Sequence, residues 1–130
     1  MPIDALGLQG HLPAFGPRVD RAALRRFLDD VAAMGFGILV TEHDVDDSGG
    51  PLSIAMRDAA VADASARFLD VVADNKATAA ILTWGLTDRF LDSPGLRARL
   101  EGYAPRRLPL DAALRRKPMW RAMERAFALA

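Results

Sequence analysis

The chain has 130 residues, of which 51% are hydrophobic and 26% charged, with 17 basic and 17 acidic side chains. This length and composition are typical of one globular domain and argue against disorder. The formal net charge of zero favours neither nucleic acid nor an anionic membrane as a partner, and the lack of cysteine excludes disulfides and thiolate metal sites.

The first predicted unit is a short strand followed by a helix. The segment IDALGLQGH, residues 3–11, is apolar and ends in polar side chains, and residues 11–17 are expected to form its loop. Asp20 can cap the helix, because its carboxylate can accept hydrogen bonds from the unpaired amides of the first turn. Gly35 marks the expected helix end. The side chains predicted on its buried face recur at helical spacing: Leu24, Phe27, Leu28 and Val31.

The second unit begins with GFGILVTEHDV, residues 35–45. Its continuous apolar run is typical of a parallel strand that is covered on both faces. The glycines and proline at residues 49–51 end it. An alanine-rich helix is expected from about residue 54 to residue 75. The side chains expected on its buried face are Val61, Ala64, Phe68 and either Val71 or Val72.

The third strand is predicted in ATAAILTWGLTD, residues 77–88, and residues 89–116 indicate a long loop or short irregular turns. Pro118 suits the first turn of a last helix. The apolar stripe of that helix is expected to consist of Trp120, Met123 and Phe127, with Trp120 in the core. The alternation of strands and helices predicts a parallel sheet with helical crossovers.

All three predicted strands end in polar or aromatic residues. In proteins with parallel strands, ligands bind at the edge where the carboxyl ends of the strands meet. This edge is therefore the expected functional site. The residues are Gln9 and His11 after the first strand, Glu42 and Asp44 after the second, and Trp84 and Asp88 after the third.

Side chains alternate along a strand, so Glu42 and Asp44 are expected on one face together with Ile38 and Val40. An ionised carboxylate beside an apolar layer costs free energy unless it is hydrogen-bonded or solvated. A polar cleft, with the His11 imidazole and a Gln9 amide pointing into it, would keep these acids charged.

The acidic stretch DVDDSGG, residues 44–50, resembles the first half of a calcium-binding loop. The twelfth position would be Ala55 instead of the bidentate glutamate, so a calcium site is rejected. The sequence contains no nucleotide-binding glycine motif either, and no cofactor or metal is expected.

Four motifs together carry a family resemblance: LGLQGHL, ILVTEHDV, ILTWGLTDRF and RRLPLDAALRRKPMWRAM. In their order and approximate spacing, over about residues 2–127, they resemble the last three strands and the final helix of glycoside hydrolase family 10, the endo-1,4-beta-xylanases. The resemblance implies an α/β fold, namely a partial (β/α)8 TIM barrel with strands six to eight and their helices in a parallel sheet. Residues 1–130 would then be one unit, the carboxyl-terminal part of a family 10 catalytic domain.

The resemblance also implies roles for five residues. Glu42 matches the catalytic nucleophile on the seventh strand, His11 matches the histidine that hydrogen-bonds it, and Asp44 matches the aspartate that orients this histidine. Gln9 and Trp84 match substrate-binding residues, the indole forming a floor for a sugar at the cleavage site. The implied reaction is retaining hydrolysis of beta-1,4 bonds in xylan. The bland alternatives are a solvated acid at Glu42, a loop histidine at His11 and a packing role for Trp84.

A retaining glycosidase needs two carboxyl groups about 5–5.5 Å apart on either side of the scissile bond. Glu42 and Asp44 lie on one strand, with alpha carbons expected about 6.6 Å apart, so both would approach from the same wall. In the family, the opposing acid is a glutamate after an asparagine on the fourth strand, and this sequence has no such pair. We therefore expect the first five units to lie outside the chain, and the chain alone to be inactive. A further departure is Asp92, where the family often has a second tryptophan.

Three kinds of partner follow from this resemblance: xylan or a xylo-oligosaccharide, a chain that supplies the missing barrel half, and a second copy that forms a homodimer. A non-catalytic xylo-oligosaccharide-binding fragment and a self-assembling fragment are the alternatives to an enzyme. Family members are usually exported, but the N-terminal residues show no signal peptide and no apolar run reaches membrane-spanning length. The compartment therefore stays open.

Overall fold

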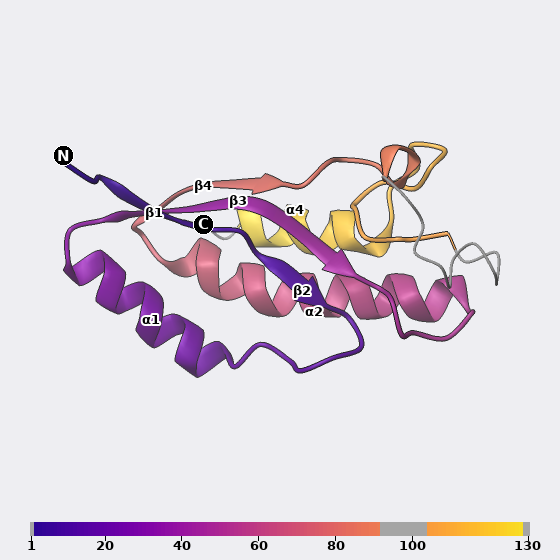
Figure 1. The fold of residues 1–130 in the computed structure, drawn as a ribbon, viewed down its shortest axis with the longest axis horizontal. Helices are drawn as coiled ribbons and strands as arrows, with labels where there is room; N and C mark the ends of the chain where they lie inside the picture. The colour runs from indigo at the N-terminus through magenta and orange to yellow at the C-terminus, as the bar shows by residue number, and fades with distance from the viewer. Residues whose placement is uncertain (1, 92–103, 129–130) are drawn as a thin grey trace.

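A parallel sheet forms one layer of the protein in the computed structural model, which describes residues 2–91 and 104–128 (Figure 1). Among the described strands, one central strand pairs with the three others. Two of them lie one after the other along one of its edges, and the third lies along its other edge. The central strand is β3 (Gly37–Asp46), with β1 (Ala5–Leu8) and β2 (His11–Pro13) on one edge and β4 (Thr78–Thr83) on the other. The predicted parallel α/β architecture is confirmed.

In the part of the chain that the structure describes, three α-helices pack against one face of this sheet (Figure 1). They are α1 (Arg21–Ala33), α2 (Ile54–Asp74) and α4 (Pro118–Ala128), and a 3-10 turn, η1 (Asp88–Phe90), follows β4. The predicted cap at Asp20 is confirmed, because its carboxylate accepts hydrogen bonds from the amides of Ala22 and Ala23. Ser53 caps α2 in the same way. No described helix is long and apolar enough to cross a membrane.

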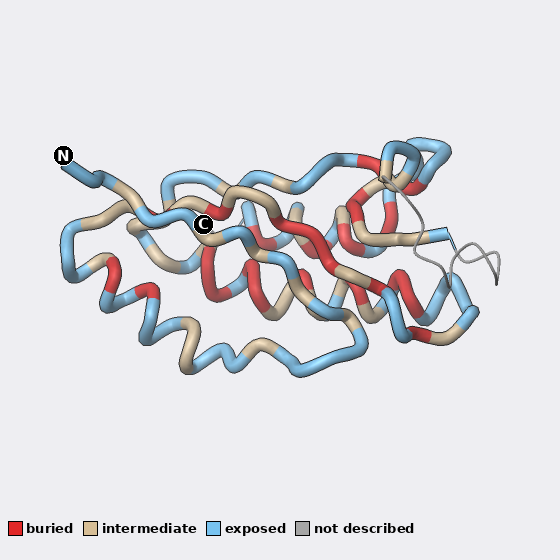
Figure 2. The backbone as a smooth tube through the Cα atoms, viewed as in Figure 1, coloured by how far each residue is buried: buried red, intermediate tan, exposed pale blue. Residues whose placement is uncertain are grey.

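The core lies between β3 and the helices. Ile38 and Val40 of β3 are fully buried against side chains of all three helices, and the red segments of Figure 2 follow this seam. Burying each such aliphatic side chain stabilises the fold by about 1.5–3 kcal/mol. The buried helix side chains include Leu28, Val31, Phe68, Leu69, Val71, Val72 and Ala126.

Two of the predicted helix faces need correction. Phe27 and Phe127 are exposed instead of buried, and Trp120 is only half-buried, with the Arg116 guanidinium 4.7 Å from the centre of its ring. On α4 the buried residues are Met119, Ala122 and Ala126. Two of these are alanines, which let α4 approach the alanine-rich α2 more closely than an aromatic ring would allow.

The first predicted strand is interrupted, which also corrects the predicted loop start at His11. Between the pairs Leu8–Val40 and His11–Asp44, two residues of the first segment oppose three residues of β3. The pairing of β3 with β4 shifts register at the same place, between Val40 and His43. An extra residue of this kind is a β-bulge, which changes the direction in which the following side chains point.

The bulge overturns the prediction that Glu42 shares a face with Ile38 and Val40. These two apolar residues pack towards the helices, and so does His43, which contacts Ser65 and Phe68 of α2. Glu42, next to His43 along the strand, instead points towards His11 on the opposite side. The carboxylate thus avoids the apolar layer.

The sheet face opposite the helices is uncovered in the described part of the chain. Leu39 and Ala80 are paired across β3 and β4, and Leu82 lies two residues beyond Ala80, so strand alternation places all three on this side. Leu82 is 52% exposed, and β4 carries exposed segments in Figure 2. An exposed apolar sheet face of this kind indicates a surface that another element can cover.

Gly10 makes the break between β1 and β2 possible, and its replacement by alanine is expected to destabilise the fold by about 1–3 kcal/mol. Its φ is +82°, and a Cβ there would stand 3.1 Å from a methyl carbon of Val40. Gly49 has the same φ of +82° but open space around it. The Gly49→Ala variant therefore measures the cost of backbone strain alone, whereas Gly10→Ala adds the close contact with Val40. Urea unfolding of both variants separates the two effects. Equal losses in both variants would contradict a role for the contact.

Candidate active site

Neighbouring strands of the sheet bring His11, Glu42 and Trp84 together. His11 is the first residue of β2, Glu42 lies within the bulge of β3, and Trp84 directly follows β4. The amide of Glu42 donates to the Gln9 carbonyl at 3.0 Å, and the amide of Trp84 donates to the His43 carbonyl at 3.1 Å. Backbone bonds therefore fix the relative positions of the three strand ends.

The His11 imidazole bridges two carboxylates. Its Nδ1 lies 2.7 Å from Oδ1 of Asp44, and its Nε2 lies 3.2 Å from Oε2 of Glu42. Carboxylates accept hydrogen bonds, so an imidazole that carries both protons satisfies both partners at once. The hydrogen bond to Asp44 is the largest influence on the pKa of His11. With the charge of Asp44 and the bond and charge of Glu42, it outweighs burial, the second-largest influence, and raises this pKa above 6.5.

Exposure differs along this triad. The Asp44 side chain is buried, whereas the Glu42 side chain is 26% exposed and the imidazole is more exposed still. Asp44 is therefore held as the inner partner of His11, while the outer Glu42 carboxylate can be reached from solvent. An arrangement with an inner acid, an imidazole and an accessible outer carboxylate can orient a nucleophile.

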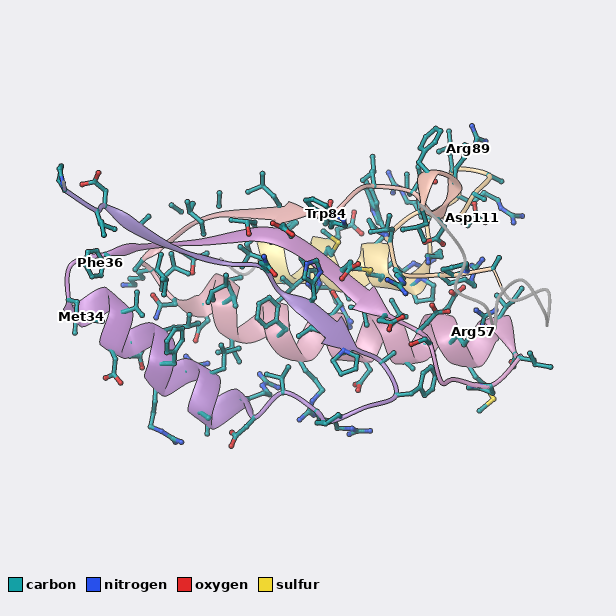
Figure 3. The ribbon with its side chains drawn as sticks, viewed as in Figure 1. Met34, Phe36, Arg57, Trp84, Arg89 and Asp111 are labelled. Atoms are coloured by element: carbon teal, nitrogen blue, oxygen red, sulfur yellow. The ribbon has the colours of Figure 1, made fainter. Side chains whose placement is uncertain are left out.

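Trp84 presents an aromatic surface beside this triad. Its side chain is 58% exposed, its ring centre lies 6.4 Å from that of His11, and the two rings meet edge to face at 89°. Figure 3 labels Trp84 just beyond the arrowhead of β4. A hollow of about 520 Å³ runs from Trp84 and Asp44 to Phe90, Arg107 and Leu114. Its volume lies within the range of ligand sites.

The geometry is that of a sheet-edge site with one accessible carboxylate, and the comparisons with known proteins agree with it. The family model for glycosyl hydrolase family 10 matches residues 1–126. This chain belongs to glycosyl hydrolase family 10. It is 30% identical over 125 residues to endo-1,4-beta-xylanase B of Thermotoga neapolitana, covering 95% of this chain and 34% of that protein.

Solved structures of family 10 xylanases superpose on the chain. Native xylanase 10B from Thermotoga maritima matches with a TM-score of 0.79 at 28% identity, over 98% of this chain and 37% of that one. Xylanase 10B from Thermotoga petrophila RKU-1, solved in complex with xylobiose, matches with a TM-score of 0.77 at 27% identity, over 97% and 36%. The family 10 chain thus spans about a third of the length of these relatives. The predicted partial TIM barrel is confirmed.

The predicted site residues of this family 10 chain fall into two groups. His11, Glu42, Asp44 and Trp84 lie together, as the sequence indicated. Gln9 is exposed and joins the site through its backbone carbonyl. Asp92 lies outside the described residues.

Sequence reasoning missed two residues next to the triad. Arg107 lines the hollow, pairs with Asp46 at 2.9 Å and accepts the amide of Val45 at its carbonyl. No local pattern distinguishes Arg107 from the surrounding arginines, because the loop brings it back to β3 only in three dimensions. His43 was missed because simple alternation places it on the face away from the helices, and only the register shift after Val40 turns it towards Ser65 of α2.

The two histidines of the family 10 chain are expected to titrate on opposite sides of 6.5. The pKa of His11 is raised, mainly by its bond to Asp44, whereas burial lowers the pKa of His43. The contribution of His11 to the stability of the fold is therefore complete at a pH below its pKa in the unfolded chain. It is lost as the pH rises through its higher pKa in the folded chain. The neutral His43 contributes to stability at a pH above its pKa in the unfolded chain. This contribution is lost as the pH falls through its lower pKa in the folded chain. NMR titration of the imidazole carbons measures both values, and a His11 pKa below 6.5 would contradict the bridged geometry.

Proposed function

We propose that this chain carries the nucleophile and part of the sugar-binding wall of a retaining endo-1,4-beta-xylanase. Glu42 would be the nucleophile, His11 its hydrogen-bond partner and Asp44 the residue that orients His11. The observation that carries this proposal is the imidazole held between a buried carboxylate and an accessible one, at 2.7 and 3.2 Å. Family membership and the likeness to a xylanase solved with xylobiose support the substrate class.

In the proposed reaction, an oxygen of Glu42 attacks the anomeric carbon of a xylosyl unit as the bond from that carbon to the leaving oxygen breaks. The leaving oxygen takes a proton from an acid on the other side of the bond. Water, deprotonated by the same acid residue, then cleaves the glycosyl ester, which returns Glu42 to its carboxylate form. The Nε2–H of His11 donates a hydrogen bond to the Glu42 carboxylate and orients it for attack.

Trp84 and Gln9 are proposed as the sugar-contacting part of the wall. The exposed indole next to His11 gives a flat apolar surface on which the C–H face of a pyranose can stack. The exposed Gln9 amide offers donors and an acceptor for sugar hydroxyls. The Gln9 carbonyl accepts the Glu42 amide and Trp84 lies beside His11, so a sugar bound at these residues would lie close to Glu42.

The proposed acid must come from outside this chain. The sequence contains glutamates at positions 42, 101 and 124 and none follows an asparagine, the pairing that marks the acid in the family. We expect the chain alone to leave xylan intact and to gain activity when mixed with a polypeptide that supplies the first five units of a family 10 barrel. Release of reducing sugar by the mixture, with both pieces folded by circular dichroism, is the test. No gain over the separate pieces would contradict the proposal.

The uncovered sheet face supports this companion chain as the partner. This face carries the apolar residues Leu39, Ala80 and Leu82. Further strands can pair with the outer edges of β1 and β4, and so extend the sheet. A second copy of the chain could cover the same face, which makes a homodimer the competing occupant. Sedimentation of the chain alone separates the two, because a monodisperse monomer excludes the homodimer.

A second candidate function is binding of xylo-oligosaccharides without catalysis, favoured by the exposure of Trp84 beside His11. Titration with xylobiose would then change the indole fluorescence in the wild-type chain and not in Trp84→Phe. Trp120 on α4 supplies the matched control, because Trp120→Phe should keep the response. A response that persists in Trp84→Phe would place the sugar elsewhere.

A further inference from the structure

His43 lies between Glu42 and Asp44 in the sequence, yet it points away from the site. Its side chain is fully buried, and its ring stacks on Phe68 of α2 with 5.4 Å between the ring centres. Nδ1 lies 2.9 Å from the Gly10 carbonyl, and Nε2 lies 2.9 Å from the Ser65 hydroxyl. The imidazole therefore joins β3 to α2 on one side and to the residue before His11 on the other.

The partners of His43 dictate its tautomer. A carbonyl can only accept, so the hydrogen bond to Gly10 requires the proton on Nδ1. Nε2 is then unprotonated and accepts a hydrogen bond from the Ser65 hydroxyl. The ring is therefore neutral, and each of its nitrogens makes one hydrogen bond. Burial lowers its pKa and favours this neutral form, while the nearby titratable groups Asp44 and His11 act in opposite directions. On β4 the facing residue is the uncharged Thr83.

The bond to Gly10 acts where the first strand changes its register. Gly10 has φ +82° and directly precedes His11. The residue before it, Gln9, accepts the Glu42 amide at its carbonyl. A donor from β3 to the Gly10 carbonyl therefore fixes the peptide that connects Gly10 to His11. The direction of that peptide sets where the imidazole of His11 leaves the backbone.

We infer that His43 is a positioning residue that locks the Gly10–His11 peptide and so aims the His11 imidazole between Glu42 and Asp44. The inference rests on the proposed function for its catalytic meaning, but its geometry can be tested without catalysis. An apolar side chain of similar volume would fill the space between β3 and α2. It would leave the Gly10 carbonyl without its donor, and the peptide before His11 would lose its anchor.

The test uses the pKa of His11, measured by NMR in the isolated full chain. His43→Leu is expected to lower it towards 6.5, because the bridging bonds to Asp44 and Glu42 loosen. His43→Asn keeps a short amide donor on the side of Gly10 and is expected to restore part of the raised value. Ser65→Ala removes the partner of Nε2 alone and should leave the pKa of His11 unchanged. A folded His43→Leu chain with the wild-type pKa of His11 would show that His43 only fills space.

The wild-type chain supplies a second measurement in case His43→Leu does not fold. Imidazole nitrogen shifts identify the tautomer of His43, and a protonated Nδ1 is the expected result. A protonated Nε2 would leave no donor for the Gly10 carbonyl and overturn the inference. Neither measurement depends on xylan. A failure of the companion-chain assay would therefore contradict the proposed function without contradicting the positioning role of His43.

Discussion

Replacing Glu42 by glutamine is expected to lower xylan hydrolysis by the completed barrel on the order of 10⁴-fold or more. Glutamine keeps the size of the side chain, and its amide oxygen can still accept from Nε2 of His11, which lies 3.2 Å from the native carboxylate. It cannot form the glycosyl ester. The measurement is kcat for the mixture of this chain with a polypeptide supplying the first five units, with binding of the two pieces checked by sedimentation.

Glu124→Gln is the matched control, because Glu124 is an exposed glutamate on α4, away from the strand ends. The same chemical change there should leave kcat unaltered. A second signature comes from Glu42→Ala with added azide, a small anion that can occupy the vacated space and attack the anomeric carbon from the same side. A xylosyl azide of inverted configuration is the expected product. Wild-type kcat in Glu42→Gln would remove Glu42 from the role of nucleophile.

The elements and the grouping of the site could be predicted from local patterns. A continuous apolar run gave β3, helical spacing gave α1 and α2, and the carboxyl ends of parallel strands meet by geometry, which brought His11, Glu42 and Trp84 together. These features depend on neighbours in sequence or on the general topology of parallel sheets.

The direction of Glu42 could not be predicted, because it depends on one extra residue in the pairing between β3 and its neighbours. Simple alternation places Glu42 with Ile38 and Val40, and only the register shift after Val40 reverses this. The predicted burial of Phe127 was wrong for a related reason. Helical periodicity predicts only the broad side of α4 that is apolar. Close packing against α2 decides which residues on that side are buried, and these include Ala122 and Ala126 but not Phe127.

The loop between β4 and α4 was expected to be irregular, yet its described part is tied down by charge pairs. Lys117, directly before α4, lies 2.7 Å from Asp88, which also accepts the amide of Leu108. Arg106 forms a two-point pair with Asp58 of α2, with both distances 2.7 Å. These bonds hold the wall of the hollow beside Trp84 against α2. Composition cannot reveal them, because the partners are up to 48 residues apart.

Asp88→Ala is expected to destabilise the chain by about 3–5 kcal/mol. The side chains of Asp88 and Lys117 are 4% and 3% exposed. Removal of the carboxylate leaves the ammonium group buried, with Asp58 at 4.0 Å as the acid that still pairs with it among the described residues. The Leu108 amide also loses its acceptor. Urea unfolding followed by circular dichroism measures the loss. Asp74→Ala is the matched control, because the 2.6 Å pair of Asp74 with Arg25 is largely exposed and should contribute at most about 1 kcal/mol.

The double variant Asp88→Leu with Lys117→Met should recover part of the stability that Asp88→Ala loses. Burial is the largest influence on both groups: it raises the pKa of Asp88 and lowers that of Lys117, so the cost of removing these charges from water offsets much of their attraction. Two apolar side chains avoid that cost, although the Leu108 amide still lacks its acceptor. If the double variant is less stable than Asp88→Ala, the attraction within the pair outweighs its desolvation. The pair would then be a main source of the free energy that holds the β4–α4 loop in place.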